Sequence, residues 1–448
     1  MHLAALNLTD LMLGLWRGTL DCDKDDDRQT WDWAVLQGDL WTTHGSLVAD
    51  MRPFLPGSFD RPPRNPAEKI SSGYKAQEFL TYVFGLGPAL LLGTLPDEYW
   101  VHFCKLVRGL RLINQRSISE DDLTLASQLF REFIEEFEAL YYQYDKHRLH
   151  FCRQSIHLLR HICEEIIRLG PLICYTQWTM ERTIGNLVEE IRQPSNPYAN
   201  LAVRGLRRCQ INALKALDPV NFDLDKSKKG PPQGAEELGD GYTLLRARDR
   251  SFHVLTPAET TVIRSFVATA RGENMDHWDP HYRRWARLRL PNGQIARSAY
   301  KETLKAPKDV RQSRNVKICV GDQTILAEVQ YFFRVQVLRD DDEPRALALV
   351  KKYSNPNRHI LERSSGAVWA CTAAEDGDWT VVEAKSIRSV VAMCPMPPAA
   401  LAQANMATGV FLVEKLGLDV MYMDGTTDGT GEDDEDEGGD RHDEQDGQ

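Results

Sequence analysis

The run from His147 to Pro194 constrains the fold most tightly, because two helical patterns follow each other there. In the first pattern, apolar residues recur at three- and four-residue spacings and predict one buried helix face. We expect Gly170-Pro171 to end this helix. The second pattern is expected to begin at Trp178 and end at Pro194, with an apolar stripe at Ile184, Leu187 and Ile191. This run predicts that the surrounding part of the chain is helical.

The first of these helices carries candidate metal ligands. His157 and His161 are four residues apart, and Glu165 follows after four more, so the three side chains would share one helix face with His150. The structural alternative is that the histidines pack and hydrogen-bond inside a helical bundle. We favour the alternative, because no general-base glutamate stands between the two histidines as in the zincin motif.

The 448 residues suffice for two or three domains. The sequence has no run of 18 apolar residues and no basic, cleavable leader, so neither a membrane span nor secretion is expected. Nine cysteines without a CxxC pair indicate reduced thiols in an intracellular protein and give no support for a zinc finger.

The acidic balance of the chain comes from its last residues. Residues 424–448 hold twelve Asp/Glu and one Arg, so this tail accounts for the whole net charge of -11. Within the neutral remainder, residues 246–317 contain sixteen Lys/Arg against seven Asp/Glu, a composition that suits a phosphate backbone. The tail cannot build a core and is expected to be disordered.

The remaining patterns predict an α+β protein with an α-rich N-terminal half. Helices are expected over 74–93 with a break at Gly85–Pro88, over 96–113, and from Ser117 or Ser119 as N-cap to about Tyr144. The acidic stretch 21–29 begins like a calcium loop but lacks its glycine and closing glutamate, so we interpret it as a solvated loop.

A change of composition divides the chain. The Pro/Gly-rich stretch 226–234 marks a linker, placed at 221–240, between a helical region 1–220 and a β-rich region 241–423. In the second region we expect a helix over 256–270 with Pro257 in its first turn. Short alternating runs predict a small barrel-like or sandwich domain, with strands at 300–306, 315–321, 324–338, 345–354, 367–373, 379–394 and 410–416.

Several long strings resemble one family. IHLLRHICEEIIRLGP, YTQWTMERTIGNLVEEIRQPSNP, LNLTDLMLGLWRG and LPDEYWVHFCKLVRGLRLI look like the C-terminal catalytic region of CACTA-type (En/Spm) DNA transposases of mushroom-forming fungi. The resemblance covers residue 1 to about 219. It implies that the helical half is the remnant of an RNase H-like catalytic region with a helical insertion. The string SVVAMCPMP near the C-terminus is similar to the tail of the same elements, where an SH3-like or BAH-like barrel is expected.

The resemblance also implies a chemistry. Such transposases hold two Mg²⁺ or Mn²⁺ ions with three carboxylates and attack a DNA phosphodiester. Glu181 matches the third carboxylate, although a first-turn glutamate also simply favours a helix N-terminus. In the family the second carboxylate immediately precedes a Met-His-Leu run, and this chain begins with that run. We therefore expect that this chain alone neither holds the metal ions nor cleaves DNA.

Two arginine groups are the candidate DNA contacts, although charge runs often form only a solvated face. They are Arg204, Arg207 and Arg208, and Arg283, Arg284 and Arg287. The leading hypothesis is a nuclear, transposon-derived protein that binds DNA or assembles with an intact transposase or with itself. The competing hypothesis is a nuclear interaction scaffold without a DNA role, whose acidic tail recruits basic partners.

Overall fold

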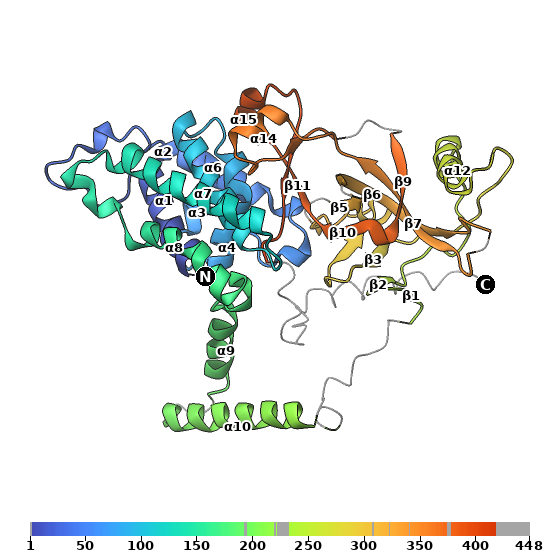
Figure 1. The fold of residues 1–448 in the computed structure, drawn as a ribbon, viewed down its shortest axis with the longest axis horizontal. Coiled ribbons are helices and arrows are strands. Elements are labelled where there is room, and N and C mark those ends of the chain that lie inside the picture. Colours follow the sequence, from blue (N-terminus) through green and yellow to red (C-terminus); the bar gives the residue numbers. More distant parts are fainter. Residues whose placement is uncertain are drawn as a thin grey trace, which may run out of the picture.

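The computed structural model describes residues 2–191, 195–218, 221, 233–306, 309–321, 323–339, 341–373 and 378–417. It mixes helices and sheets, as the sequence predicted. Most of the linker 221–240 and the whole acidic tail lie outside the described residues, as does Pro194. Figure 1 shows a helical body formed by the N-terminal half, a β-rich body formed by the C-terminal half, and two helices that project from the first.

Every regular element in the described part of 2–218 is helical. Wider π-helical turns occur at His2–Leu8, Leu80–Leu86 and Glu138–Tyr142. The α-helices are α1 Thr9–Trp16, α2 Gly38–Asp50, α3 Pro66–Lys69, α4 Ala76–Phe79, α5 Gly87–Leu90, α6 Asp97–Ile113, α7 Glu120–Phe137, α8 Gln154–Leu169, α9 Trp178–Glu189 and α10 Pro197–Leu217.

The helical body is held by a large aromatic core. The first turn of α7 is capped as predicted, because the Ser119 hydroxyl accepts from the Asp122 amide at 3.1 Å. The apolar face of α7 packs on α6, where the Gly109 backbone lies against the Phe130 ring. Large side chains with less than 2% exposure fill the interior, including Trp16, Trp33, Trp100, Phe103, Phe133 and Phe137.

The helix predicted over 74–93 has no break at Gly85–Pro88. Residues Ala76–Leu90 form α4, a π-helical stretch and α5 in direct succession. The Gly87 amide donates to the Tyr82 carbonyl five residues back, and Pro88 follows in the first turn of α5, where its missing N–H is not needed. A wider turn therefore absorbs the proline that was expected to interrupt the helix.

The β-rich body contains two antiparallel sheets that share one core. The sheets have the strand orders β1-β2-β3-β4 and β10-β5-β6-β7-β9, and the bridge between Trp285 and Phe332 joins them. Their strands are β1 Glu236–Gly239, β2 Tyr242–Leu244, β3 Arg287–Arg289, β4 Ile295–Arg297, β5 Asn315–Val320, β6 Gln323–Val335, β7 Arg345–Lys352, β9 Trp379–Glu383 and β10 Ile387–Val390.

Two predictions at the edges of this body had different outcomes. α12 Pro257–Arg271 begins as expected, with a capping box in which Thr256 and Glu259 satisfy each other's amides. The strand predicted at 300–306 is wrong. Ala299–Glu302 forms the short helix α13, because the buried Glu302 carboxylate accepts from the Ser313 amide at 2.9 Å and Arg314 at 3.2 Å. These contacts of Glu302 with residues further along the chain outweigh the alternating pattern that predicted a strand.

The late part of the chain returns to the helical body. A third sheet, with strand order β11-β12-β8, shares its hydrophobic core with the N-terminal helices, as do α14 and α15. The half-buried Arg111 guanidinium joins these parts by donating to the carbonyls of Phe84 and Ala367. These elements are β8 Ala370–Cys371, β11 Ala392–Pro395, β12 Val410–Val413, α14 Arg358–Arg363 and α15 Pro398–Ala404. The region 241–423 therefore contributes to two cores.

Candidate functional site

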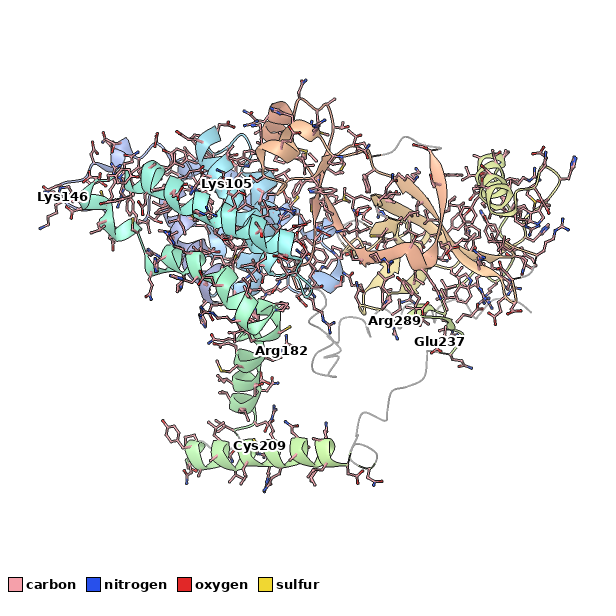
Figure 2. The ribbon with its side chains drawn as sticks, viewed as in Figure 1. Lys105, Lys146, Arg182, Cys209, Glu237 and Arg289 are labelled. Atoms are coloured by element: carbon pink, nitrogen blue, oxygen red, sulfur yellow. The ribbon has the colours of Figure 1, made fainter. Side chains whose placement is uncertain are left out.

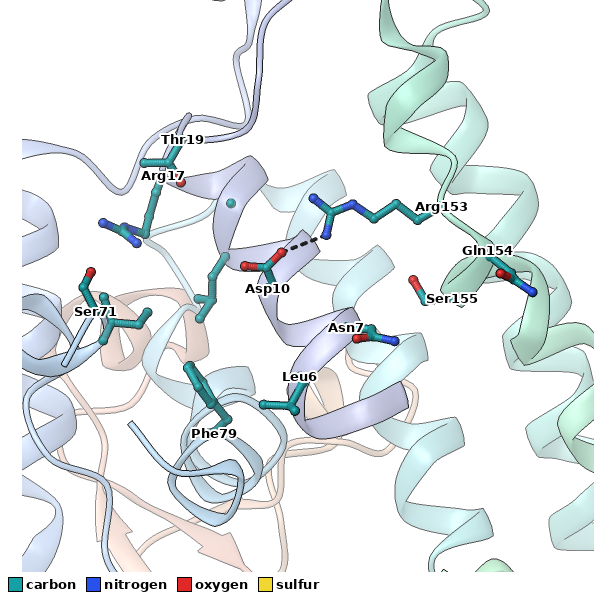
Figure 3. A pocket seen from close by; sticks show the side chains of 13 residues that line it. Leu6, Asn7, Asp10, Arg17, Thr19, Ser71, Phe79, Arg153, Gln154 and Ser155 are labelled. Carbon is teal, nitrogen blue, oxygen red and sulfur yellow. Dashed lines mark hydrogen bonds and ion pairs between the residues drawn. The ribbon is translucent and has the colours of Figure 1, made fainter. Parts of the chain in front are cut away.

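An open groove of about 650 Å³ runs along the exposed side of α1 (Figure 3). Successive turns of α1 form the floor of the groove through Asp10, Leu13 and Gly14, because residues at three- and four-residue spacings lie on the same side of a helix. The turn after α3 and the side chain of Phe79 form one wall, and the amino-terminal end of α8 forms the other. The lining residues with polar side chains are Asn7, Asp10, Arg17, Thr19, Ser71, Arg153, Gln154 and Ser155.

The groove contains two arginines and one carboxylate. Arg153 donates from Nη1 to Asp10 Oδ2 at 2.8 Å, which links the α8 wall to the floor formed by α1. The Arg17 guanidinium lies over the Trp41 ring, 4.6 Å from its centroid. No carboxylate of the described residues lies within salt-bridge distance of Arg17, and burial lowers the pKa of its guanidinium from the usual value. The groove thus presents an excess of positive charge.

Glu181, the predicted third carboxylate, lies in the first turn of α9 as expected. Its side chain is 43% exposed, and the nearest partner is His2, whose Nε2 lies 3.4 Å from Oε1. Among the described residues, the group of three metal-type ligands within reach of one another is Asp23, Asp25 and His147, and Glu181 is not part of it.

The histidine pair lies on the exposed side of α8. His157 Nε2 and His161 Nε2 are 3.1 Å apart, so the predicted spacing does bring the two rings together. Both residues are exposed, and the interpretation that they pack inside the bundle is wrong. Glu165 does not complete a three-ligand group with them, and its carboxylate accepts from Arg168 at 3.5 Å. The pair alone offers two ligands.

The acidic loop after α1 is held by its neighbours. Asp23, Asp25 and His147 place their ligand atoms within 4.8 Å of one another, and the Asp23 carboxylate contacts His147 Nδ1 at 3.2 Å. Beside them, Asp26 forms a buried ion pair with Arg148. Both aspartates of the three-residue group are exposed. We interpret the loop as an ion-paired surface element.

The first arginine group lies on α10, which no other body covers (Figures 1 and 2). α10 contains four cationic residues, no Asp or Glu and no buried residue. Arg207 is exposed, Arg204 is half-buried, and Arg208 pairs with Glu190 at 2.5 Å. Cys209 on the same helix stands clear of the rest of the molecule in Figure 2.

The second arginine group has structural contacts within the β-rich body. Arg284 pairs with Asp249 at 2.8 Å and stacks on the Tyr300 ring. The guanidinium of Arg283 lies over the Phe252 ring at 5.3 Å from its centroid. Arg287 begins β3 and is half-buried. Because β3 and α10 lie in separate parts of the molecule, the two groups do not form one surface (Figure 1).

Two features were not predicted from the sequence. The groove joins Asp10 to Arg153, which lies 143 positions later, and no local spacing signals that. Large apolar residues also form a stripe on the exposed sides of α9 and α10, and its members are 43–82% exposed: Met180, Ile184, Val188, Val203, Leu206, Leu214 and Leu217. Among the described residues, no helix has the length and apolar content that crossing a bilayer requires.

The chain was compared with protein-family models, curated proteins and solved structures. No family model, no curated protein and no solved structure matches this chain.

Proposed function

We propose that this chain is a transposon-derived, nuclear DNA-binding protein similar to the C-terminal part of CACTA-type transposases, and that α10 is its main DNA contact. The observation that carries the proposal is the projecting α10, with four cationic residues and no acidic one. Arg208 pairs with Glu190, whereas Arg207 is exposed, and cations on an uncovered helix can contact phosphates. The second arginine group is occupied by aromatic and acidic neighbours, so we assign it a supporting role.

The dimensions of α10 fit this role. Its 21 residues span about 30 Å, roughly the length of one turn of B-form DNA. The major groove admits an α-helix, and the cations along one side would contact the flanking phosphates. Such contacts fix position without reading sequence, so we expect binding with little base preference.

The chain is proposed to bind DNA without cutting it. Glu181, which lies beside His2, would be the surviving third carboxylate of the family's site for Mg²⁺ or Mn²⁺. The helical body would be the remnant of the RNase H-like region. The shared core of the two larger sheets supports an SH3-like or BAH-like barrel, because such modules close a small sheet around one core.

The test measures DNA affinity by fluorescence anisotropy with a labelled duplex at low salt. The variant Arg204→Ala/Arg207→Ala/Lys215→Ala removes three cations of α10, and Arg52→Ala/Lys69→Ala/Lys146→Ala removes three exposed cations of the helical body. We expect the first variant to lose at least tenfold in affinity and the second to stay close to the unmodified protein. Equal losses in both would contradict a role for α10.

A second candidate function rests on the exposed apolar stripe of α9 and α10. Large apolar residues exposed on two consecutive helices indicate a contact with another protein. In that case the chain would be an interaction scaffold, or would assemble with a transposase or with itself. Leu206→Lys/Leu214→Lys would then abolish assembly in sedimentation experiments. Absence of DNA binding together with this effect would favour the scaffold over the DNA-binding protein.

A further inference from the structure

The groove along α1 exposes the amino-terminal end of α8. The N-cap residue Arg153 makes no side-chain cap, and among the described residues no acceptor is recorded for the amides of Gln154 and Ser155. A helix of 16 residues concentrates partial positive charge at this end. Amides of this kind bind anions in many proteins. An independent observation at the same place is needed before a ligand is assigned.

Ser155 supplies that observation. The residue is 6% exposed, and its buried hydroxyl has no hydrogen-bond partner among the described residues. Figure 3 shows it on the side of α8 that faces α1, near Asn7 and Arg153, in the wall of the groove. Buried hydroxyl groups in native proteins are nearly always paired. An acceptor on a ligand in the groove would satisfy this hydroxyl.

The charged side chains around this end of α8 favour an anionic ligand. Arg153 uses Nη1 to contact Asp10, so its Nε and Nη2 groups remain for a ligand. Across the groove, the planar face of Arg17 is covered by Trp41 while its edge carries donors that no described carboxylate accepts. Planar guanidinium groups match the oxygens of phosphate esters.

We propose that this groove binds a phosphate ester. The phosphate would accept from the Ser155 hydroxyl, the amides of Gln154 and Ser155, and Arg153, while Arg17 would contact a second anionic group of the same ligand. The groove volume of about 650 Å³ lies within the range of small-ligand sites. Asp10 occupies Nη1 of Arg153 and, because it is negative, would weaken the binding of an anion. The inference is independent of the role of α10.

The test measures pyrophosphate binding to the full chain by titration calorimetry. Ser155→Ala is expected to weaken binding about tenfold, because a hydrogen bond to a charged acceptor is lost. The matched control is Ser298→Ala, which removes another buried hydroxyl without a partner, at a residue that does not line the groove. Asp10→Asn is expected to tighten binding severalfold, since it removes a like charge; a merely structural Asp10 would instead leave affinity unchanged or lower it.

Competition identifies the source of the phosphate. If a short oligothymidylate displaces pyrophosphate, the groove takes a phosphate of a nucleic-acid strand. If it does not, the ligand is a free phosphorylated molecule; both results support the phosphate site. Circular dichroism of each variant checks that the fold is retained. The proposal is overturned if neither probe binds, or if Ser155→Ala and Ser298→Ala bind alike.

Discussion

The buried ion pair between Asp26 and Arg148 offers a stringent test of the helical body. Their side chains are 2% and 6% exposed, and the guanidinium contacts the carboxylate at 2.8, 3.0 and 3.1 Å. The Trp31 indole also donates to Asp26, at 2.9 Å. Replacing one partner leaves a buried charge without compensation, so Asp26→Asn is expected to lower the free energy of unfolding by about 3–5 kcal/mol.

A double-mutant cycle refines this magnitude. Arg148→Met alone should lower the free energy of unfolding by a similar amount, because it leaves the Asp26 carboxylate buried without its ion-pair partner. Asp26→Asn/Arg148→Met removes both charges and should cost clearly less than the sum of the single changes. Urea unfolding followed by circular dichroism gives the three values. Additive costs, or a loss below about 1 kcal/mol for Asp26→Asn, would refute the description of the pair as buried and coupled.

The pair also predicts a pH dependence. Burial alone would raise the pKa of the Asp26 carboxyl, but hydrogen bonds from Arg148 and Trp31 outweigh it, and the pKa is lowered from the usual value. A lowered carboxyl pKa in the folded state means that the stabilisation is present above the unfolded pKa of about 3.9 and is lost as the pH falls through the folded pKa. In Asp26→Asn this part of the acid sensitivity should disappear.

Two further predictions concern the other packing contacts. Glu259→Gln should lower the free energy of unfolding by about 1–3 kcal/mol, because the buried carboxylate accepts from the Tyr331 hydroxyl at 2.6 Å and the Thr256 amide at 2.7 Å. The control Glu273→Gln, at an exposed ion pair, should change the urea midpoint little. Gly109→Ala should lower the free energy of unfolding by about 1–3 kcal/mol, because a Cβ there would lie 2.6 Å from the Phe130 ring. In the control Gly185→Ala on α9, the new Cβ has no atom within 4 Å and should not destabilise the protein.

Helix boundaries were the most predictable part of this fold. The caps at Ser119 and Thr256 and the stop at Gly170 depend on residues within one turn of the helix end, so the local sequence contains the information. The π-helical turn before Pro88 was not predictable, because proline is usually incompatible with a continuing helix. The strand patterns of β5, β6 and β7 were also recognised, whereas the pattern at 300–306 belongs to a region that begins as a helix and the short strands β1–β4 were not predicted. The core that each strand would join was not predicted either.

The candidate site residues were less accessible to sequence reasoning. The spacing of His157 and His161 predicted a shared helix face, and their Nε2 atoms lie 3.1 Å apart, but spacing cannot tell whether another element covers them. Ser155 and Arg17 gave no signal, because their environment is created by α1, α3 and α8 packing together. Exposure of the α9 and α10 stripe could not be foreseen either, since an amphipathic pattern normally indicates a buried face.

The salt dependence of DNA affinity tests the central claim most directly. Each cation that neutralises a phosphate contributes about 0.9 to the slope of log affinity against log salt concentration. We predict that Arg204→Ala/Arg207→Ala/Lys215→Ala reduces this slope by about 2.7 relative to the unmodified chain. An unchanged slope, or an unmodified chain whose DNA affinity does not depend on salt, would contradict the assignment of α10 as the DNA-binding element.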